Sequence, residues 1–373
     1  MNGFSATILG ASGSGVPGSD RLPDPLARAI SYEHTSSATF GFESLRITFP
    51  TTLDEAMFWA GQLMASIASS GPDAMPAWEG FLAGVEISVG TRQRSISIDA
   101  MANRVRVRYT TVNGVAGVTA TASDASSQAR YGVKDLVESL PTTTAAAADN
   151  RRAVLLSARA WPRMQPTTEI GTGGGGAVTC TLIGAGWYAA LDWLLTSNAT
   201  TSTAVTTAQV ASLLTGYAAT NAFLSSTTRI TASSVSDTQA IDADTTSRAA
   251  IERLLIQGNG AQRYAWGVYE DRIFHAAPWA GATPDAVTYR GSLGDGARVF
   301  SAQGNVIMPW SVRPDSIYEE SDLLDAAARA GMPDAAARHY VERVTFGMDA
   351  SGYRLGLEPA AASDLDVLLA RLG

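Results

Sequence analysis

The chain has 373 residues, of which 46% are hydrophobic and only 17% are charged, and its formal net charge is −8. This length provides for two or three domains with sizeable cores. An acidic balance without any basic run argues against a nucleic-acid groove, and a single cysteine excludes an intrachain disulfide and a multi-cysteine metal site.

The basic residues are almost all arginine, because Lys134 is the only lysine. Ala, Thr, Ser and Gly take the place of charged residues. Low surface charge and guanidinium groups suit large contacts with other chains, since few ions must be desolvated and arginine binds carboxylates in two-pronged geometry. A GC-rich genome produces the same composition, so both explanations stay open.

Residues 1–30 are rich in Gly, Ser and Pro, which predicts a loose N-terminal arm. The start, MNGFSATILGASGSG, has neither the basic region nor the apolar core of a secretory signal. No stretch approaches the roughly 20 apolar residues that a membrane-spanning helix needs. We therefore expect a soluble protein made in the cytoplasm.

Residues 31–140 are predicted to form a first β-rich module. Alternation in SYEHTSSATFGFESLRITFP indicates strands. The next segment, residues 52–70, predicts a helix that begins with a capping box of Thr52 and Glu55 and ends before Gly71. Its expected apolar core stripe consists of Leu53, Met57, Ala60, Met64 and Ile67.

Strands are predicted again across residues 76–120. In RVRVRYT, alternation places Arg104, Arg106 and Arg108 on one face of a strand. Three arginines in a row could bind an anion, but a solvated face or an interface is the favoured interpretation. Residues 126–140 predict a helix that leaves this module.

Residues 141–260 are predicted to form a mixed α/β middle module, with PTTTAAAADN as its boundary. The run GTGGGGAV lacks the Lys-Ser/Thr of a phosphate loop and the spacing of a dinucleotide fingerprint, so it predicts a hairpin tip or linker. Cys180 lies in the apolar strand VTCTLIG and is expected to be buried. The segment TTSRAAIERLLIQGNG predicts a helix with Gly258 at its end.

Residues 261–373 are predicted to form a second β-rich module with a C-terminal helix in ASDLDVLLARLG. YAWGVYEDRIFHAAP predicts a hairpin with Glu270 and Asp271 at its tip and with Phe274 and His275 on opposite faces. VTYR, ARVFSA and VIMPWSVRP predict strands, SDLLDAAARAG a helix, and YVERVTFGMDASGYRLGLEP another hairpin. Blocks of strands and helices without a regular βαβ period indicate the α+β class.

Catalytic chemistry finds no clear support in the sequence. The three histidines, His34, His275 and His339, have no partner at metal-ligand spacing. Carboxylates such as Glu79, Glu270 and Asp271 could act as an acid–base pair, but nothing selects them. We therefore predict no catalytic, cofactor-binding or metal-binding residue and no enzymatic activity.

The order of several segments resembles tail-tip proteins of tailed bacteriophages, the baseplate-hub or tail-associated family. The segments are WEGFLAGVEISVGTRQRSISIDA, TCTLIGAGWYAALDWLL, TTAQVASLLTGYA, IERLLIQGNG, YAWGVYEDRIF, MPWSVRPDSIYEESDLL and YVERVTFGMDASGYRLGLEP. The resemblance covers most of residues 32–358. Its motifs are a pattern of order and spacing rather than a chemical fingerprint.

The resemblance implies a virion protein that forms a trimeric ring from two β-barrel-like or sandwich modules per subunit. Such a ring adapts the sixfold tail to a threefold tip and leaves a lumen for DNA. The implied partners are other copies of the chain, a distal tail or tail tube protein, a tip, spike or receptor-binding protein, and the end of the tape measure. Passing DNA would not be bound specifically.

Three other functions stay open. A sixfold distal tail ring protein would share most of these features. A tail-associated cell-wall hydrolase would need two carboxylates that converge in a cleft. A receptor-binding module would use some of the eight tryptophans as stacking platforms, although the alternation around Trp266 and Trp310 predicts that several tryptophans are buried.

Overall fold

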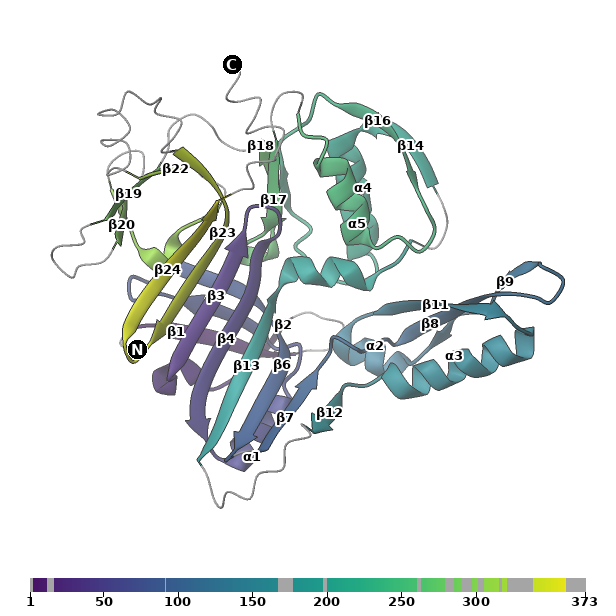
Figure 1. The fold of residues 1–373 in the computed structure, drawn as a ribbon, viewed down its shortest axis with the longest axis horizontal. Coiled ribbons are helices and arrows are strands. Elements are labelled where there is room, and N and C mark those ends of the chain that lie inside the picture. Colours follow the sequence, from purple (N-terminus) through teal and green to yellow (C-terminus); the bar gives the residue numbers. More distant parts are fainter. Residues whose placement is uncertain are drawn as a thin grey trace.

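A large curled sheet, a helical module and a projecting arm make up the chain in the computed structural model (Figure 1). The structure describes residues 3–11, 17–90, 92–166, 177–196, 200–259, 263–278, 285–289, 297–300, 305–314, 317–320 and 338–359. The mixture of helices and strands confirms the predicted α+β class.

Nine strands form the main sheet, and each pairs antiparallel with the next. In spatial order they are β2 (Pro17–Arg21), β1 (Ser5–Ala11), β5 (Ser66–Ser70), β6 (Pro76–Val89), β13 (Val178–Gly186), β4 (Gly41–Thr51), β3 (Ser31–Ser37), β23 (Arg338–Asp349) and β24 (Gly352–Pro359). Two further strands, β7 (Arg92–Ser97) and β12 (Arg163–Pro166), extend the second half of β6. Strands from both ends of the chain therefore share one sheet.

Smaller groups of strands attach to this sheet. The hairpin of β17 (Tyr264–Val268) and β18 (Phe274–Pro278) meets β4, and β15 (Thr228–Ile230) pairs with β18. Near the start of β23 lie β22 (Ile317–Glu320), β19 (Asp285–Tyr289), β20 (Ala297–Phe300) and β21 (Val306–Ile307). Single helical turns occur at η1 (Pro25–Arg28), η3 (Glu270–Arg272) and η4 (Pro309–Ser311).

The main sheet curls around a core rich in aromatic side chains. Phe4, next to β1, stacks on Phe346 of β23 with ring centroids 5.9 Å apart, although these strands lie near opposite edges of the sheet. Trp310 meets Phe4 edge-on at 5.2 Å. No pairing among the described strands closes the sheet into a barrel. The prediction of barrel-like modules is therefore wrong for this part of the chain.

The helical module packs α4 (Thr206–Ala218) against α5 (Ser247–Leu255) beside η2 (Trp187–Trp193). A two-stranded ribbon of β14 (Thr200–Val205) and β16 (Ser236–Ile241) belongs to this module. The predicted end of α5 is confirmed, because Gly258 has a φ of 70° and donates its N–H to the carbonyl of Leu255.

The projecting arm contains residues 102–160 and has its own sheet (Figure 1). Its central strand, β8 (Arg104–Thr110), pairs with β9 (Ala116–Val118) and β10 (Ala122–Ser123) on one side and in parallel with β11 (Asp135–Thr142) on the other. Two helices, α2 (Ala125–Tyr131) and α3 (Ala145–Arg159), complete the arm.

The prediction of a loose arm over residues 1–30 is wrong for the described residues. Strand β1 pairs with β5 along five residues, and Ala6 and Ile8 are fully buried. The many small residues of this segment favoured the prediction of a loose arm, but its apolar side chains alternate along β1 and face the core.

The helix predicted over residues 52–70 ends early. Thr52 caps α1 (Leu53–Ala60) by accepting the N–H of Glu55 as predicted, but residues 66–70 form β5. The helix turns a different face inward, so Ala56 and Trp59 are buried while Leu53 and Met57 are exposed.

The helix predicted over residues 126–140 is also interrupted. Gly132 adopts a φ of 75°, which ends α2, and β11 follows. The predicted boundary at residues 141–150 instead begins α3, with Thr144 as its N-cap.

Since β23 pairs with β3, the module boundaries at 140 and 260 do not coincide with the sheets. The predicted helices SDLLDAAARAG and ASDLDVLLARLG lie outside the described residues.

Candidate functional site: a polar joint at the base of the arm

The arm has a small hydrophobic core that is separate from the main core. Val105 and Val107 of β8 are fully buried against Ala148 and Leu155 of α3. The alternation in RVRVRYT therefore sends the valines into the arm and the arginines to the opposite face, as predicted. Tyr131 and Val133 of the arm nevertheless pack against the main core, and polar contacts add to this attachment.

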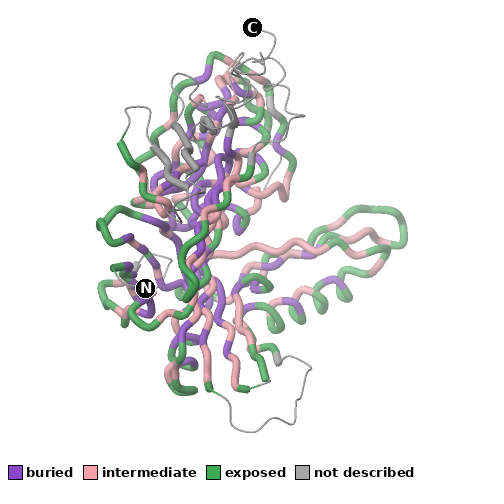
Figure 2. The backbone as a smooth tube through the Cα atoms, turned by 60° about the vertical axis from the view of Figure 1, so that its left-hand side comes forward, coloured by how far each residue is buried: buried purple, intermediate pink, exposed green. Residues whose placement is uncertain are grey.

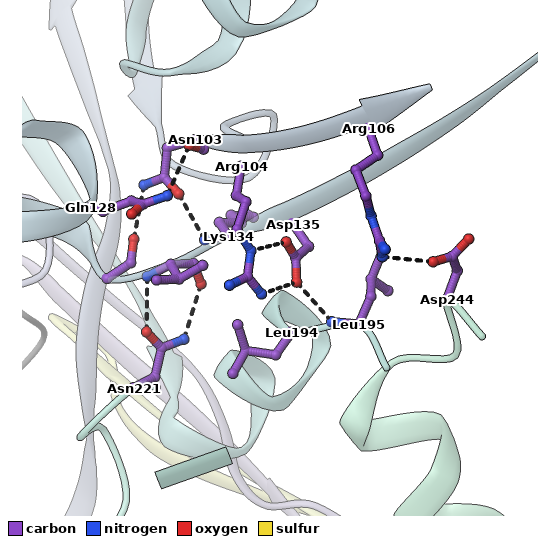
Figure 3. A network of polar contacts seen from close by, with 12 residues as sticks. Asn103, Arg104, Arg106, Gln128, Lys134, Asp135, Leu194, Leu195, Asn221 and Asp244 are labelled. Atoms are coloured by element: carbon purple, nitrogen blue, oxygen red, sulfur yellow. Dashed lines mark hydrogen bonds and ion pairs between the residues drawn. The ribbon is translucent and has the colours of Figure 1, made fainter. Parts of the chain in front are cut away.

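The first of these contacts is made by Asp135, which is also paired within the arm to Arg104 on the neighbouring strand. Arg104 donates Nε and Nη2 to the two carboxylate oxygens of Asp135, at 2.5 and 2.7 Å. The same carboxylate accepts the backbone N–H of Leu195, from the helical module, at 3.0 Å (Figure 3). The Asp135 side chain is 6% exposed, and its hydrogen bonds raise the pKa of Arg104 above the usual value.

A second carboxylate receives the other two arginines of the row. Asp244, in the loop before α5, accepts Arg106 at 2.8 Å and Arg108 at 2.5 Å. Asp244 holds a φ of 68°, a conformation that Asp and Asn tolerate better than most residues. The row of arginines therefore forms an interface within the chain. All three guanidinium groups are paired with carboxylates, which argues against the alternative that they bind an anion.

Two buried amides fasten the inner end of the joint. Asn103 is fully buried, donates to the carbonyl of Gly132 at 2.8 Å and accepts the backbone N–H of Lys134 at 2.9 Å. Asn221, from the helical module, forms a two-way pair with the backbone of Val133, at 2.8 and 2.9 Å (Figure 3). These bonds satisfy backbone groups that would otherwise be buried without a partner.

Lys134 crosses the joint toward the body. Its ammonium donates to the carbonyls of Ile98 and Asp99 at 2.7 and 3.0 Å and lies 5.0 Å from the ring centroid of Trp193. Burial lowers the pKa of this amine to about 8. The one lysine of the chain is therefore a structural tether.

A cavity of about 650 Å³ lies beside the joint, between the arm and the helical module. Arg104, Arg106 and Asp135 line it from the arm, and Tyr217 and Ser247 line it from the other side. Since both arginines bind carboxylates, the charge of its wall is already compensated. Chemically, the joint suits holding two parts of the chain in one orientation.

The carboxylates considered for catalysis partly come together at the tip of the β17–β18 hairpin. Glu79 accepts the backbone N–H of Asp271 at 2.7 Å, and Glu270 forms an ion pair with Arg313. Burial raises the pKa of Glu79 above its usual value. The hairpin is confirmed, and Phe274 is buried while His275 is half-buried, as predicted for opposite faces.

His34 is a residue of the main core. It is 2% exposed, its Nδ1 lies 2.9 Å from the hydroxyl of Tyr32, and burial lowers its pKa to about 3. His275 packs edge-on against Tyr269 at 6.0 Å. The backbone of His339 lies in β23, opposite Tyr318 of β22.

The buried position predicted for Cys180 is confirmed. The glycine run at 171–176 lies outside the described residues. Within the described ranges, no group of three or more potential ligands could hold a metal ion, and no helix is long and apolar enough to cross a membrane.

Sequence reasoning missed the partners of the arginine row. Asp135 was assigned to a helix, and Asp244 lies 138 positions from Arg106. The alternation of charge and valine in β8 was the one signal for the joint. Nothing in the sequence pointed to Asp244, Asn103 or Asn221.

No protein-family model matches the chain, and no curated protein matches it. Solved structures that are similar to it at low identity include the following three. The 43 kDa tail protein of prophage MuSo2 from Shewanella oneidensis has 7% identity and a TM-score of 0.45, with 96% of this chain and 97% of that chain covered. The tail protein from Neisseria meningitidis MC58 has 7% identity and a TM-score of 0.42, with 95% of each chain covered.

The third is the E. coli c3393 protein, a component of the type VI secretion system that exhibits structural similarity to the T4 bacteriophage tail proteins gp27 and gp5. It has 8% identity and a TM-score of 0.35, with 90% of this chain and 74% of that chain covered. Because all three TM-scores lie below 0.5, we infer neither family nor function from these likenesses.

Proposed function

We propose that this chain is a structural subunit of a bacteriophage tail tip, of the baseplate-hub type. Three copies form a ring that joins the sixfold tail to a threefold tip and leaves a lumen for DNA. Its neighbours are a distal tail or tail tube protein on one side and a tip, spike or receptor-binding protein on the other. The order of the sequence motifs supports this role.

One observation carries the proposal: side chains of the resembling motifs fasten those motifs to one another. Glu270, in the YEDR motif, forms an ion pair with Arg313 of the PWSVRP motif. The Arg313 guanidinium lies 4.7 Å from the ring centroid of Tyr269 and 5.3 Å from that of Phe42. Charged motif residues that tie distant strands together support a scaffold role.

We also propose that the chain is not an enzyme. The carboxylates that could act in hydrolysis are engaged, since Glu79 binds the backbone of Asp271 and Glu270 binds Arg313. Zymography on peptidoglycan tests this. A cleared band that disappears in Glu79→Gln but persists in Asp149→Asn, on the exposed face of α3, would establish the hydrolase instead.

A receptor-binding module receives less support. Trp59, Trp78 and Trp187 are among the largest fully buried side chains, and Trp266 is buried as predicted. Among the described tryptophans only Trp161 is exposed, and its indole N–H is bound to Asp124 at 3.0 Å. Stacking platforms for sugars are therefore few in this part of the chain.

Symmetry-resolved cryo-electron microscopy of intact virion tail ends tests the proposal. Three copies around the axis, next to a sixfold ring, are expected. Six copies would place the protein in the distal tail ring instead. A particle without this chain would contradict the phage role altogether.

A further inference from the structure

A groove of about 430 Å³ lies between helix α5 and neighbouring strands of the body. The helix and its C-cap contribute four residues spaced by three or four positions, which places them on one face. They are Ala249, Glu252, Arg253 and Ile256. The other lining residues include Phe40 after β3, Trp266 of β17 and Glu342 of β23.

Part of this groove is apolar and open to solvent. Ile256 is 76% exposed, and Phe40 is half-buried. A single exposed isoleucine is common on a protein surface, but this one borders a hollow whose wall also holds the rings of Phe40 and Trp266. The groove therefore offers apolar side chains a place to dock.

The charged groups around the groove leave one cation without a carboxylate. Glu342 binds Arg263 at 2.9 Å, and Glu252 binds Arg248 at 2.7 Å. Arg253 forms no ion pair within the described residues, and its hydrogen bond goes to a backbone carbonyl of β16 at 3.2 Å. An acidic group that entered the groove would thus find an exposed guanidinium.

The described part of the chain ends beside this groove. Strand β24 ends at Pro359, whose partner in the antiparallel register is Val341 of β23. The next residue of β23 is Glu342, in the wall of the groove. Residues 360–373 lie outside the described residues. Because the three residues between Pro359 and Ser363 can span about 10 Å, the segment that follows them starts within reach of the groove.

The sequence of this segment predicts a short amphipathic helix. Ser363 and Asp366 have the spacing of a capping box, and Asp364 also belongs to the first turn. Its leucines share one face, at spacings of three and four residues: Leu365, Leu368, Leu369 and Leu372. A helix of this length is marginal in water unless its apolar face packs against another surface.

We propose that residues 363–372 form a helix that occupies the groove of their own chain. Their leucines pack against Phe40, Trp266 and Ile256, and the ten residues, about 15 Å long, lie along the exposed face of α5. The leucine spacing matches the spacing of the α5 residues, as helix-to-helix packing requires. Asp364 and Asp366 supply the carboxylate that Arg253 lacks. This docking does not depend on a role in a phage tail.

A pair of engineered cysteines tests the contact in the full chain. Ile256→Cys and Leu369→Cys are introduced together, and the protein is oxidised mildly. The native Cys180 does not interfere, because it is buried and burial raises the pKa of its thiol to about 12.

The control pairs Leu369→Cys with Val112→Cys. Val112 is 77% exposed, which matches Ile256. The β8–β9 turn that contains Val112 belongs to the tip of the arm, away from α5 in both views (Figure 1, Figure 2). A free segment would collide with both exposed thiols, whereas a docked one meets only the thiol at position 256.

A disulfide within one chain that forms about tenfold faster or more with Ile256→Cys than with Val112→Cys supports the proposal. Disulfide-linked dimers of the Ile256→Cys, Leu369→Cys protein would assign the groove to the segment of a second copy and would overturn it. Equal rates for the two pairs, or no disulfide with either, would overturn it as well.

Hydrogen exchange measured by mass spectrometry gives a second readout on residues 363–372. Slow exchange is expected in the native chain. Ile256→Asp should reduce this protection by about tenfold or more, because it places a carboxylate among the leucines and beside two other acidic groups. Val112→Asp should leave it unchanged. Exchange at the rate of an unstructured peptide in the native chain, or equal protection in Ile256→Asp, would show that the groove does not hold this segment.

Discussion

Arg106 on strand β8 and Asp244 in the loop before α5 lie 138 positions apart and meet at 2.8 Å. Arg108 binds the second oxygen of the same carboxylate. A single side chain of the helical module thus holds two arginines of the arm. Because the arm has its own core, this ion pair helps to fix the direction in which the arm points.

Replacing Asp244 is expected to loosen the arm. Asp244→Asn keeps a residue that tolerates the φ of 68° but removes the charge, and the loss of two half-buried ion pairs should lower the free energy of unfolding by about 1 to 2 kcal/mol. Chemical denaturation measures the loss, and faster amide exchange in residues 104–110 reports the loosening.

The matched control is Asp149→Asn, which removes an exposed ion pair with Arg152. Surface pairs of this kind contribute about 0 to 1 kcal/mol, so the control should change stability little. Equal effects of the two substitutions would contradict a special role for Asp244.

Lys134 makes stability depend on pH in the alkaline range. Its pKa falls from 10.5 to about 8 on folding, so above pH 8 the folded chain binds fewer protons than the unfolded chain. The contribution of Lys134 to the free energy of unfolding should therefore rise as the pH increases from about 7.5 to about 9.

Lys134→Met provides the comparison for this effect. Denaturation at several pH values should show the difference between wild type and variant growing in favour of the wild type. A difference that is constant with pH would show that the amine keeps its ordinary pKa. Cys180 is common to both proteins, so its own titration cancels.

His34 should act in the acidic range. Its pKa falls from 6.5 to about 3 on folding, so between these values the unfolded chain binds the additional proton. Stability from this residue is present above pH 6.5 and is lost as the pH falls. His34→Asn should lower stability at neutral pH but flatten the decline between about pH 7 and about pH 5, as thermal unfolding can measure. A decline as steep as in the wild type would rule out His34 as its cause.

The hairpin of β17 and β18 needs Gly267 for its close approach to β4. A Cβ at this position would lie 2.2 Å from the backbone nitrogen of Gly41. Gly267→Ala should therefore separate the strands and lower the free energy of unfolding by about 1 to 3 kcal/mol.

Gly216 in α4 is the control for this substitution, because a Cβ added there would meet nothing within 4 Å. Gly216→Ala should raise stability by roughly 0.5 to 1 kcal/mol, through better helix propensity. The opposite sign of the two Gly→Ala changes is the result to check by chemical denaturation. Equal small effects of the two substitutions would mean that β4 can shift to accommodate a Cβ at Gly267 at little cost in free energy.

Local patterns predicted local structure well. The alternation in RVRVRYT identified which side of β8 is apolar, and Thr52 and Glu55 identified the start of α1. The hairpin around Glu270 and the buried Cys180 were also predicted correctly. These features depend on side-chain periodicity and capping, which act between residues close in the sequence.

Elements that depend on distant partners were predicted poorly. Residues 66–70 follow a helix and share its apolar stripe, but they pair with β1 and β6, so tertiary contacts outweigh helix propensity there. Leu53 and Met57 were assigned to the core because the predicted stripe continued into these residues, but both side chains are exposed.

The sequence by itself determined the α+β class, the low charge and the two faces of β8, because composition and alternation can be read without knowing which distant residues meet. Only the tertiary structure decided that the first and last strands share a sheet and that Asp135 and Asp244 receive the arginine row. Such long-range pairs depend on how the whole backbone is routed, and no local spacing encodes which of the chain's 35 carboxylates will face a given guanidinium.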